Sequence, residues 1–278
     1  MMTRLRPRGS AYAFGDTDMA ARRLEVVAEV YSPSSRALLG SAVTSPPGLA
    51  YDLGCGPGYT TALVSEETRA RRTIGLDSSA AHVARARESA PARAESAGKC
   101  FVEFAVHDVL RLPFPSGRAD LVYCRLLLAH LPDPAAAVLD WATQLTPRGL
   151  VIVDEIEWIS TSHPLLRAHL SIAEALVAAG GARMCAGPLI ARLSSEPALE
   201  RKVARISEVP VPESRAAAMF GMNISAWGDQ PVALGLCGRA ELDELAAGLA
   251  EMADSRAAGE ITWGMHQAAY ARADAVGR

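Results

Sequence analysis

The fold of this chain is decided by one stretch, Asp52-Leu53-Gly54-Cys55-Gly56-Pro57-Gly58-Tyr59. The short apolar run 48–51 before it predicts a buried strand, and 60–64 behind it has the pattern of a helix start. A strand, a glycine-rich turn and a helix together begin a nucleotide-binding α/β unit. Glycine suits such a turn because it tolerates positive φ and lets a ligand lie against bare backbone.

The same stretch argues against cofactors that contain a pyrophosphate. A dinucleotide-binding turn has a third glycine at the position where Tyr59 stands. Pro57 also lacks the backbone N–H that a pyrophosphate would use. The phosphate-loop pattern, which ends in Lys followed by Ser or Thr, is absent from the chain. The turn therefore favours a ligand without phosphate over NAD, FAD or ATP.

The turn resembles the first motif of the class I S-adenosylmethionine-dependent methyltransferases. The resemblance implies that S-adenosylmethionine is the cofactor and S-adenosylhomocysteine the product. It also implies that the methionine part of the cofactor lies against this turn. The residues expected to hold that part are Asp52, Gly54, Cys55 and Gly56.

Two further acidic residues of the family pattern follow in order. The second predicted strand ends in Asp77, with Ser78 next to it, and a carboxylate there is suited to accepting hydrogen bonds from both ribose hydroxyls. The third predicted strand is followed by Asp108, which the resemblance places against the adenine amino group. Val109 comes next and is expected to pack on the adenine ring. Three acidic residues after three successive strands are better explained by a binding site for this cofactor than by unrelated helix caps or solvated turns.

We predict an α/β fold, a Rossmann-like doubly wound sheet of seven strands whose last strand is antiparallel. After the fourth strand the segment His130-Leu131-Pro132-Asp133-Pro134 resembles the family's loop before the next helix. The resemblance covers roughly residues 48–157. The expected strands are 48–51, 72–77, 101–106, 119–125, 150–155, 206–212 and 261–271.

We divide the chain into an N-terminal helical lid at 1–47 and a methyltransferase core at 48–278, with a cap inserted after the fifth strand at about 157–205. The lid is expected to hold one helix that begins at 16 or 17 and a second, shorter one at 33–40. In the lid, Tyr12 and Phe14 either close the pocket over the cofactor and substrate or pack as ordinary aromatic residues. The cap should lie over the carboxyl ends of the strands, where open α/β sheets bind ligands.

Composition narrows the class of partner. The formal net charge of −3 gives no overall basic field that would attract nucleic acid. The five cysteines are scattered, with no paired Cys or His spacing, which fits a reducing cytoplasm and predicts no metal site. No apolar run approaches the roughly 20 residues that span a bilayer. We expect a cytoplasmic protein without nucleic-acid or membrane partners, with a homo-oligomer as one possibility.

The predicted function is metal-independent, in-line transfer of a methyl group to a small molecule, such as a secondary metabolite, at O or at N, S or C. Much of the rate of such a reaction comes from holding the nucleophile close and aligned, so no catalytic residue is obligatory. Two alternatives stay open. The chain either binds the cofactor without methyl transfer, as a cyclase or a regulatory protein, or methylates a protein or an RNA.

Candidate residues for the acceptor side each have more than one interpretation. His130 is either a general base or a residue that orients its loop, and His163, at the start of the cap, is either catalytic and substrate-facing or structural. Trp158 and Met184 either line the substrate pocket or belong to the core. Arg125, at the end of the fourth strand, holds the cofactor carboxylate, a substrate acid, or a salt-bridge partner within the fold.

Overall fold

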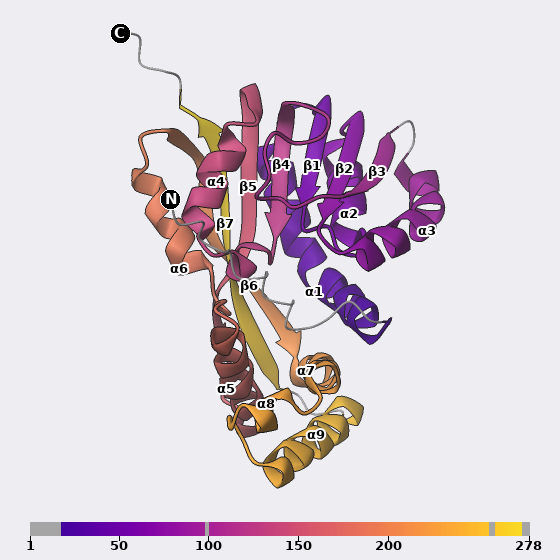
Figure 1. Ribbon diagram of the computed structural model, residues 1–278, viewed down its shortest axis with the longest axis vertical. Helices are drawn as coiled ribbons and strands as arrows, with labels where there is room; N and C mark the ends of the chain where they lie inside the picture. Colours follow the sequence, from indigo (N-terminus) through magenta and orange to yellow (C-terminus); the bar gives the residue numbers. More distant parts are fainter. Residues whose placement is uncertain (1–17, 98–99, 256–258, 274–278) are drawn as a thin grey trace, which may run out of the picture.

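The structure is a computed structural model that describes residues 18–97, 100–255 and 259–273 (Figure 1). Its centre is a seven-stranded sheet with the order β3-β2-β1-β4-β5-β7-β6. Strands β1 to β5 are parallel, and the last strand, β7, is antiparallel to both β5 and β6. The fold class predicted from the sequence is therefore confirmed. The strands are β1 Leu49–Leu53, β2 Arg72–Asp77, β3 Phe101–Val106, β4 Ala119–Arg125, β5 Leu145–Ser160, β6 Leu199–Pro212 and β7 Glu260–Arg272.

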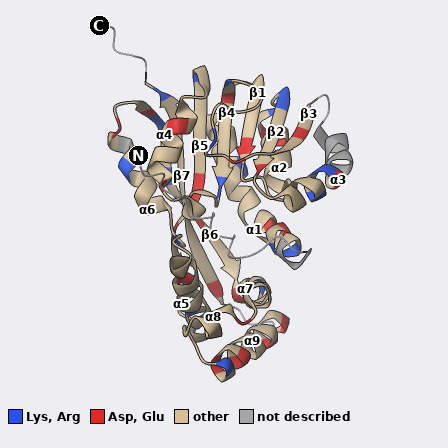
Figure 2. Cartoon of the chain, viewed as in Figure 1, with Lys and Arg blue, Asp and Glu red and all other residues tan. Residues whose placement is uncertain are grey.

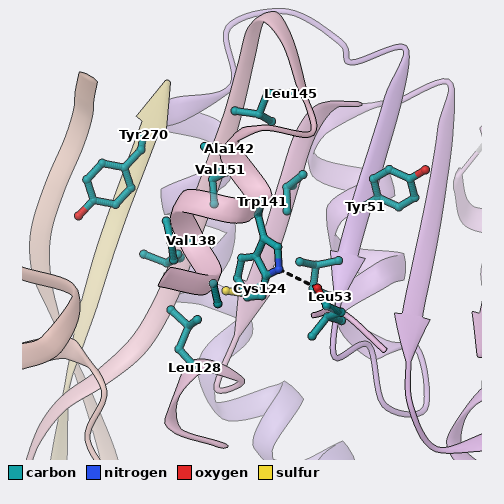
Figure 3. Packing of buried hydrophobic residues seen from close by; sticks show 14 of the residues in the cluster. Tyr51, Leu53, Cys124, Leu128, Val138, Trp141, Ala142, Leu145, Val151 and Tyr270 are labelled. Carbon is teal, nitrogen blue, oxygen red and sulfur yellow. Dashed lines mark hydrogen bonds between the residues drawn. The ribbon is translucent and has the colours of Figure 1, made fainter. Parts of the chain in front are cut away.

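Helices cover both faces of the sheet because successive strand residues point to opposite sides. Tyr51 and Leu53 of β1 pack on the face covered by α4 (Pro134–Ala142), where the indole of Trp141 is fully buried (Figure 3). Ala50 packs on the opposite face with α2 (Tyr59–Thr68) and the second half of α1 (Asp18–Ala42). Helix α3 (Ala80–Ala97) lies beside β3 at the edge of the sheet.

Beyond the carboxyl ends of β1 to β4, a second hydrophobic core holds a helical layer together. Strands β5, β6 and β7 extend past their neighbours into this layer, which lies at the bottom of Figure 1. Its helices are α5 (Pro164–Ala179), α7 (Glu213–Trp227), α8 (Gln230–Ala233) and α9 (Arg239–Asp254). Of the shorter elements, α6 (Gly187–Ile190) contacts β5, η1 (Leu128–His130) contacts α4, and η2 (Ala191–Ser195) contacts β6. Val27 and Tyr31 of α1 join this second core, so α1 spans both layers.

Several element boundaries differ from the sequence predictions. Helix α1 runs through Pro33 instead of stopping there, because Leu38 and Leu39 behind it are fully buried against the sheet and that burial outweighs the proline's cost of about 3 kcal/mol. Strands β5 and β6 are longer than predicted, and α7 and α8 were not predicted at all. Tyr12, Phe14 and the expected helix start at 16 or 17 lie outside the described residues. Among those residues, no helix is long and apolar enough to cross a membrane.

Candidate functional site

A cavity of about 730 Å³ opens at the carboxyl ends of the parallel strands, between the sheet, α1, α5 and α7. Its size suits a cofactor-sized ligand, since small-molecule sites usually enclose about 300–1,000 Å³. It brings together most of the residues that the sequence predicted for the site. Those that line it are Gly54, Cys55, Gly56, Asp77, Ser78, Asp108, Val109, Arg125, His130 and Met184.

The glycine-rich turn forms one wall and is held against the end of β2. The backbone N–H groups of Gly54 and Cys55 both donate to the carbonyl of Leu76, at 2.8 and 3.1 Å. Gly54 and Gly56 have φ angles of +67° and +52°, which residues with a side chain rarely adopt. A Cβ on Gly54 would also come within 2.8 Å of Leu127 Cδ1. The positive φ angles therefore favour glycine in this turn, and a side chain at Gly54 would also have to displace the Leu127 side chain.

Asp77, at the end of β2, ties this turn to the start of α3. Its Oδ2 accepts a hydrogen bond from the N–H of Gly56 at 2.9 Å, and its Oδ1 accepts one from the N–H of Ser79 at 2.8 Å. Each carboxylate oxygen can accept more than one hydrogen bond, so both keep accepting capacity toward the cavity. This arrangement suits a pair of adjacent hydroxyl groups.

Asp52 lies beneath the turn and does not line the cavity. The hydroxyls of Thr60 and Thr61 both donate to its Oδ2 at 2.6 Å, while its buried Oδ1 has no protein partner among the described residues. Burial raises the pKa of this carboxyl to about 6. Asp52 therefore fixes the start of α2 against the turn from behind the cavity wall, and its contact with the cofactor stays a prediction.

The loop after β3 carries the next two predicted residues. Asp108 is exposed, and its Oδ1 accepts a hydrogen bond from the N–H of Leu110 at 3.0 Å. Val109 is buried at the cavity wall, and its carbonyl accepts a hydrogen bond from Trp141 Nε1 at 2.9 Å. Because Trp141 belongs to the core under α4, the position of this loop is set by the packing of the sheet.

Arg125 is a buried cation at the cavity wall, with 8% of its surface exposed. Its one hydrogen bond to a described residue runs from Nη1 to the hydroxyl of Ser35 at 3.2 Å. The neighbouring carboxylate of Asp154 instead accepts hydrogen bonds from Ser35, Tyr123 and Gln267. No carboxylate of the described residues forms an ion pair with Arg125, so the internal salt bridge considered from the sequence is absent there. A buried guanidinium in this situation suits an anionic ligand group.

The remaining sequence candidates separate into residues inside and outside the cavity. His130 lines the cavity at the end of η1, and burial lowers its pKa to about 4, with the positive charge of Arg23 adding to the shift. His163 does not line it; its Nδ1 accepts from the N–H of Leu165 and caps α5. Trp158 is also outside, because its indole lies over Gly264 of β7.

Glu155, at the end of β5, is a cavity residue that sequence reasoning missed. Its Oε1 accepts hydrogen bonds from the N–H groups of Leu127 and Leu128, at 2.8 and 2.9 Å. These bonds hold the loop after β4, in which Leu126 has a φ of +55°. The available signal was an acidic residue at the carboxyl end of a predicted central strand, and burial raises its pKa to about 8.

We expect Glu155→Gln to flatten the pH dependence of stability between about pH 7 and 8. The folded chain keeps the Glu155 proton there while the unfolded chain has lost it, so the free energy of unfolding falls as pH rises. Between pH 7 and pH 8, the free energy of unfolding of the wild-type chain should fall by about 1 kcal/mol more than that of the variant. Urea unfolding at several pH values measures the difference. Glu174→Gln, at an exposed site on α5, is the control and should follow the wild type.

The cavity chemistry fits S-adenosylmethionine. Asp77 offers a carboxylate for the ribose diol, the turn offers bare backbone, and Arg125 offers a buried cation for the amino-acid carboxylate. The loop at Val109 gives an apolar surface for a base. When bound, this cofactor supplies a methyl group made electrophilic by a positively charged sulfur.

Comparisons with known proteins agree with this geometry. Residues 51–153 match the family model described as a methyltransferase domain. The chain is 33% identical over 117 residues to a trans-aconitate 2-methyltransferase of Escherichia coli, which covers 42% of each chain. It is 31% identical over 135 residues to the enzyme of that name from Azoarcus, covering 48% of this chain and 49% of the relative. The match thus spans less than half of either relative.

Solved structures resemble most of the chain in fold alone. A S-adenosylmethionine-dependent methyltransferase from Thiobacillus denitrificans, solved with S-adenosylhomocysteine, has a TM-score of 0.52 at 17% identity and covers 87% of this chain and 92% of its own. The cyclase SpnF has a TM-score of 0.50 at 17% identity, covering 86% of this chain and 80% of its own. Residues 51–153 are therefore similar to a methyltransferase domain, and the chain shares its fold with a solved S-adenosylmethionine-dependent methyltransferase.

Proposed function

We propose that this chain is a S-adenosylmethionine-dependent methyltransferase that acts on a small molecule enclosed between the sheet and the helical layer. The observation that carries the proposal is the single continuous cavity of about 730 Å³. It reaches from Asp77 and Asp108 at the strand ends to α5 and α7. Such a cavity lets one wall hold a methyl donor while another positions an acceptor, and alignment of that kind supplies much of the rate of transfer.

The roles of the cofactor residues follow from their places around the cavity. Asp77, with Ser78 beside it, is proposed to bind the ribose. Asp108 and Val109 are proposed to bind the adenine. Arg125 and the backbone of the glycine-rich turn are proposed to hold the methionine part. Tyr12 stays a sequence-based proposal for closing the pocket.

Several features support a small acceptor over a macromolecular one. The helical layer covers the strand ends with α5 and α7, and these helices contribute apolar residues to the cavity wall. Acidic and basic residues are interspersed on α1 and α9 in Figure 2, without a continuous basic stripe in that view. We propose that the lid at 1–47 and the cap at about 157–205 enclose the small acceptor. Helix α7 is added to the cap because its residues line the cavity. The sulfonium methyl is already electrophilic, so the proposed reaction needs no metal.

Methyl transfer is tested with the purified chain and S-adenosylmethionine labelled in its methyl group. We expect S-adenosylhomocysteine and a labelled small molecule to form with one or more members of an acceptor panel, and no label on added RNA or protein. Binding of S-adenosylhomocysteine without any transfer across the panel would favour the cofactor-binding alternative, for which the cyclase SpnF offers a fold precedent. Label on RNA or protein would replace the small-molecule proposal with the macromolecular one.

A further inference from the structure

Three polar side chains from three helices meet in the helical layer, next to the apolar part of the cavity wall. We name this group the cap cluster; it consists of Arg23 of α1, His169 of α5 and Asn223 of α7, and all three line the cavity. Nε of Arg23 donates to Oδ1 of Asn223, and Nδ2 of Asn223 lies 3.4 Å from Nε2 of His169. None of the three lies within the methyltransferase-domain match at 51–153.

The cap cluster is built so that each member fixes the next. Because Oδ1 of Asn223 accepts from Arg23, its amide nitrogen faces His169, whose Nε2 must accept. The His169 ring is stacked between Phe220, with ring centres 3.9 Å apart, and Trp227, at 5.0 Å. Burial, with Arg23 adding to it, lowers the pKa of His169 to about 3, so the ring stays neutral. His169 thereby positions Asn223, and Asn223 positions the guanidinium of Arg23.

The charges around the cavity are divided between its two ends. The carboxyl groups of Asp77, the last residue of β2, and Asp108, in the loop after β3, lie at the end assigned to the nucleoside. The described residues that line the end toward the helical layer include three cations, Arg23, Arg125 and Arg183, of which Arg183 is exposed. Among the described residues that line this end, Glu155 has the one carboxyl group, and burial raises its pKa to about 8, which favours the neutral form at pH 7. The carboxylate of Asp154 does not line the cavity and accepts hydrogen bonds from Ser35, Tyr123 and Gln267. This end therefore favours an anion.

We propose that the methyl acceptor is a carboxylic acid whose carboxylate is bound by Arg23 and whose body is apolar. The inference rests on the proposed function and names its substrate class. The cofactor has one carboxylate, which Arg125 is placed to bind, and Arg23 supplies a second cation for the acceptor. The apolar body would lie against Leu170, Ala173, Val177, Met219, Phe220 and Trp263.

Transfer to a carboxylate is chemically balanced without a catalytic base. One carboxylate oxygen forms the new bond to the methyl carbon as the carbon–sulfur bond breaks, and the sulfur keeps that electron pair. The negative charge of the acceptor and the positive charge of the sulfur cancel, and no proton moves. This agrees with the two cavity histidines nearest the helical layer, His130 and His169, whose pKa values are lowered to about 4 and 3, so that both are weak bases. The neutral methyl ester would lose its ion pair with Arg23 and leave readily.

The direct test is a binding comparison between carboxylates and their amides. The purified full chain, saturated with S-adenosylhomocysteine, is titrated by calorimetry with benzoate, trans-cinnamate, 2-naphthoate and decanoate, and with the primary amide of each. We expect at least one carboxylate to bind about tenfold or more tightly than its amide. The same acid, incubated with methyl-labelled S-adenosylmethionine, should yield label that mild alkali releases as methanol, as an ester does and an ether or amine does not.

Variants of the two neighbouring arginines assign the effect to Arg23. Arg23→Gln should abolish the preference for the carboxylate, and Arg23→Lys should restore part of it. Arg22→Gln is the matched control, because Arg22 is the next residue on α1, is exposed and does not line the cavity. Affinity for S-adenosylhomocysteine should stay within about twofold in all three, which also shows that they are folded.

The possible outcomes distinguish a failure of the carboxylate proposal from a failure of the proposed methyltransferase function. If the chain binds S-adenosylhomocysteine but no carboxylate binds more tightly than its amide, or if Arg23→Gln keeps the preference, the carboxylate proposal is wrong while the methyltransferase proposal stands. Alkali-resistant label on an alcohol or amine acceptor leads to the same conclusion. Failure of the wild-type chain to bind S-adenosylhomocysteine overturns the proposed function itself.

Discussion

Replacing Asp77 with alanine is expected to weaken the binding of S-adenosylhomocysteine by about 100-fold or more. The Asp77 carboxylate has two roles in this structure: it accepts hydrogen bonds from Gly56 and Ser79, and it faces the cavity where a ribose diol would lie. Hydrogen bonds to a charged group contribute about 1.5–3 kcal/mol each, so losing two to the ribose accounts for a factor of this size. Isothermal titration calorimetry with S-adenosylhomocysteine measures it.

Two controls separate a lost ligand contact from a damaged fold. Asp140→Ala removes an exposed aspartate on α4 and should leave the affinity unchanged. Asp77→Asn keeps the size of the side chain but not its charge, and should fall between the wild type and Asp77→Ala. An affinity of Asp77→Ala within threefold of the wild type would show that the ribose lies elsewhere.

The largest effect on stability is expected from Trp141→Ala. The Trp141 side chain is fully buried between α4 and the sheet, and its Nε1 donates to the carbonyl of Val109 (Figure 3). Truncating a buried tryptophan usually lowers the free energy of unfolding by about 3–5 kcal/mol, because it leaves a cavity and removes apolar contacts. Urea denaturation followed by circular dichroism measures the change.

Trp141→Phe refines this prediction, because it keeps most of the buried apolar area and removes the hydrogen bond to Val109. We expect it to cost about 1–3 kcal/mol, since the carbonyl of Val109 is left buried without that donor. It should also weaken cofactor binding more than its effect on stability suggests, because Val109 lines the proposed adenine site. A loss below about 1 kcal/mol in Trp141→Ala would mean that the packing under α4 is looser than described.

The nucleotide end of the site could be predicted from the sequence because its signals are local. A strand of period two, a turn that needs positive φ and an acidic residue at a strand end each depend on a few neighbouring residues. The parallel order of the strands then brings Gly54, Asp77 and Val109 to one edge of the sheet. Their common place around the cavity follows from topology once the strands are known.

The acceptor end could not be predicted, because its residues meet only through long-range packing. Arg23 and Asn223 are 200 residues apart in the sequence and touch because α1 and α7 share the second core. The spacing of Ala216, Phe220 and Trp227 is a helical signal for α7, although this helix was not predicted. His163 and Trp158 were expected in the pocket by their place in the chain, but capping of α5 and packing on β7 draw them away.

The central claim is that the methyl donor lies on the Asp52–Gly58 turn with its sulfur toward the cap cluster, and a crystal structure of the chain with S-adenosylhomocysteine tests it most directly. We predict that the ribose hydroxyls lie within hydrogen-bonding distance of Asp77 and the adenine beside Val109. The sulfur should face the part of the cavity lined by Arg23 and Phe220. A ligand bound outside this cavity, or one whose sulfur points away from α5 and α7, would contradict the account.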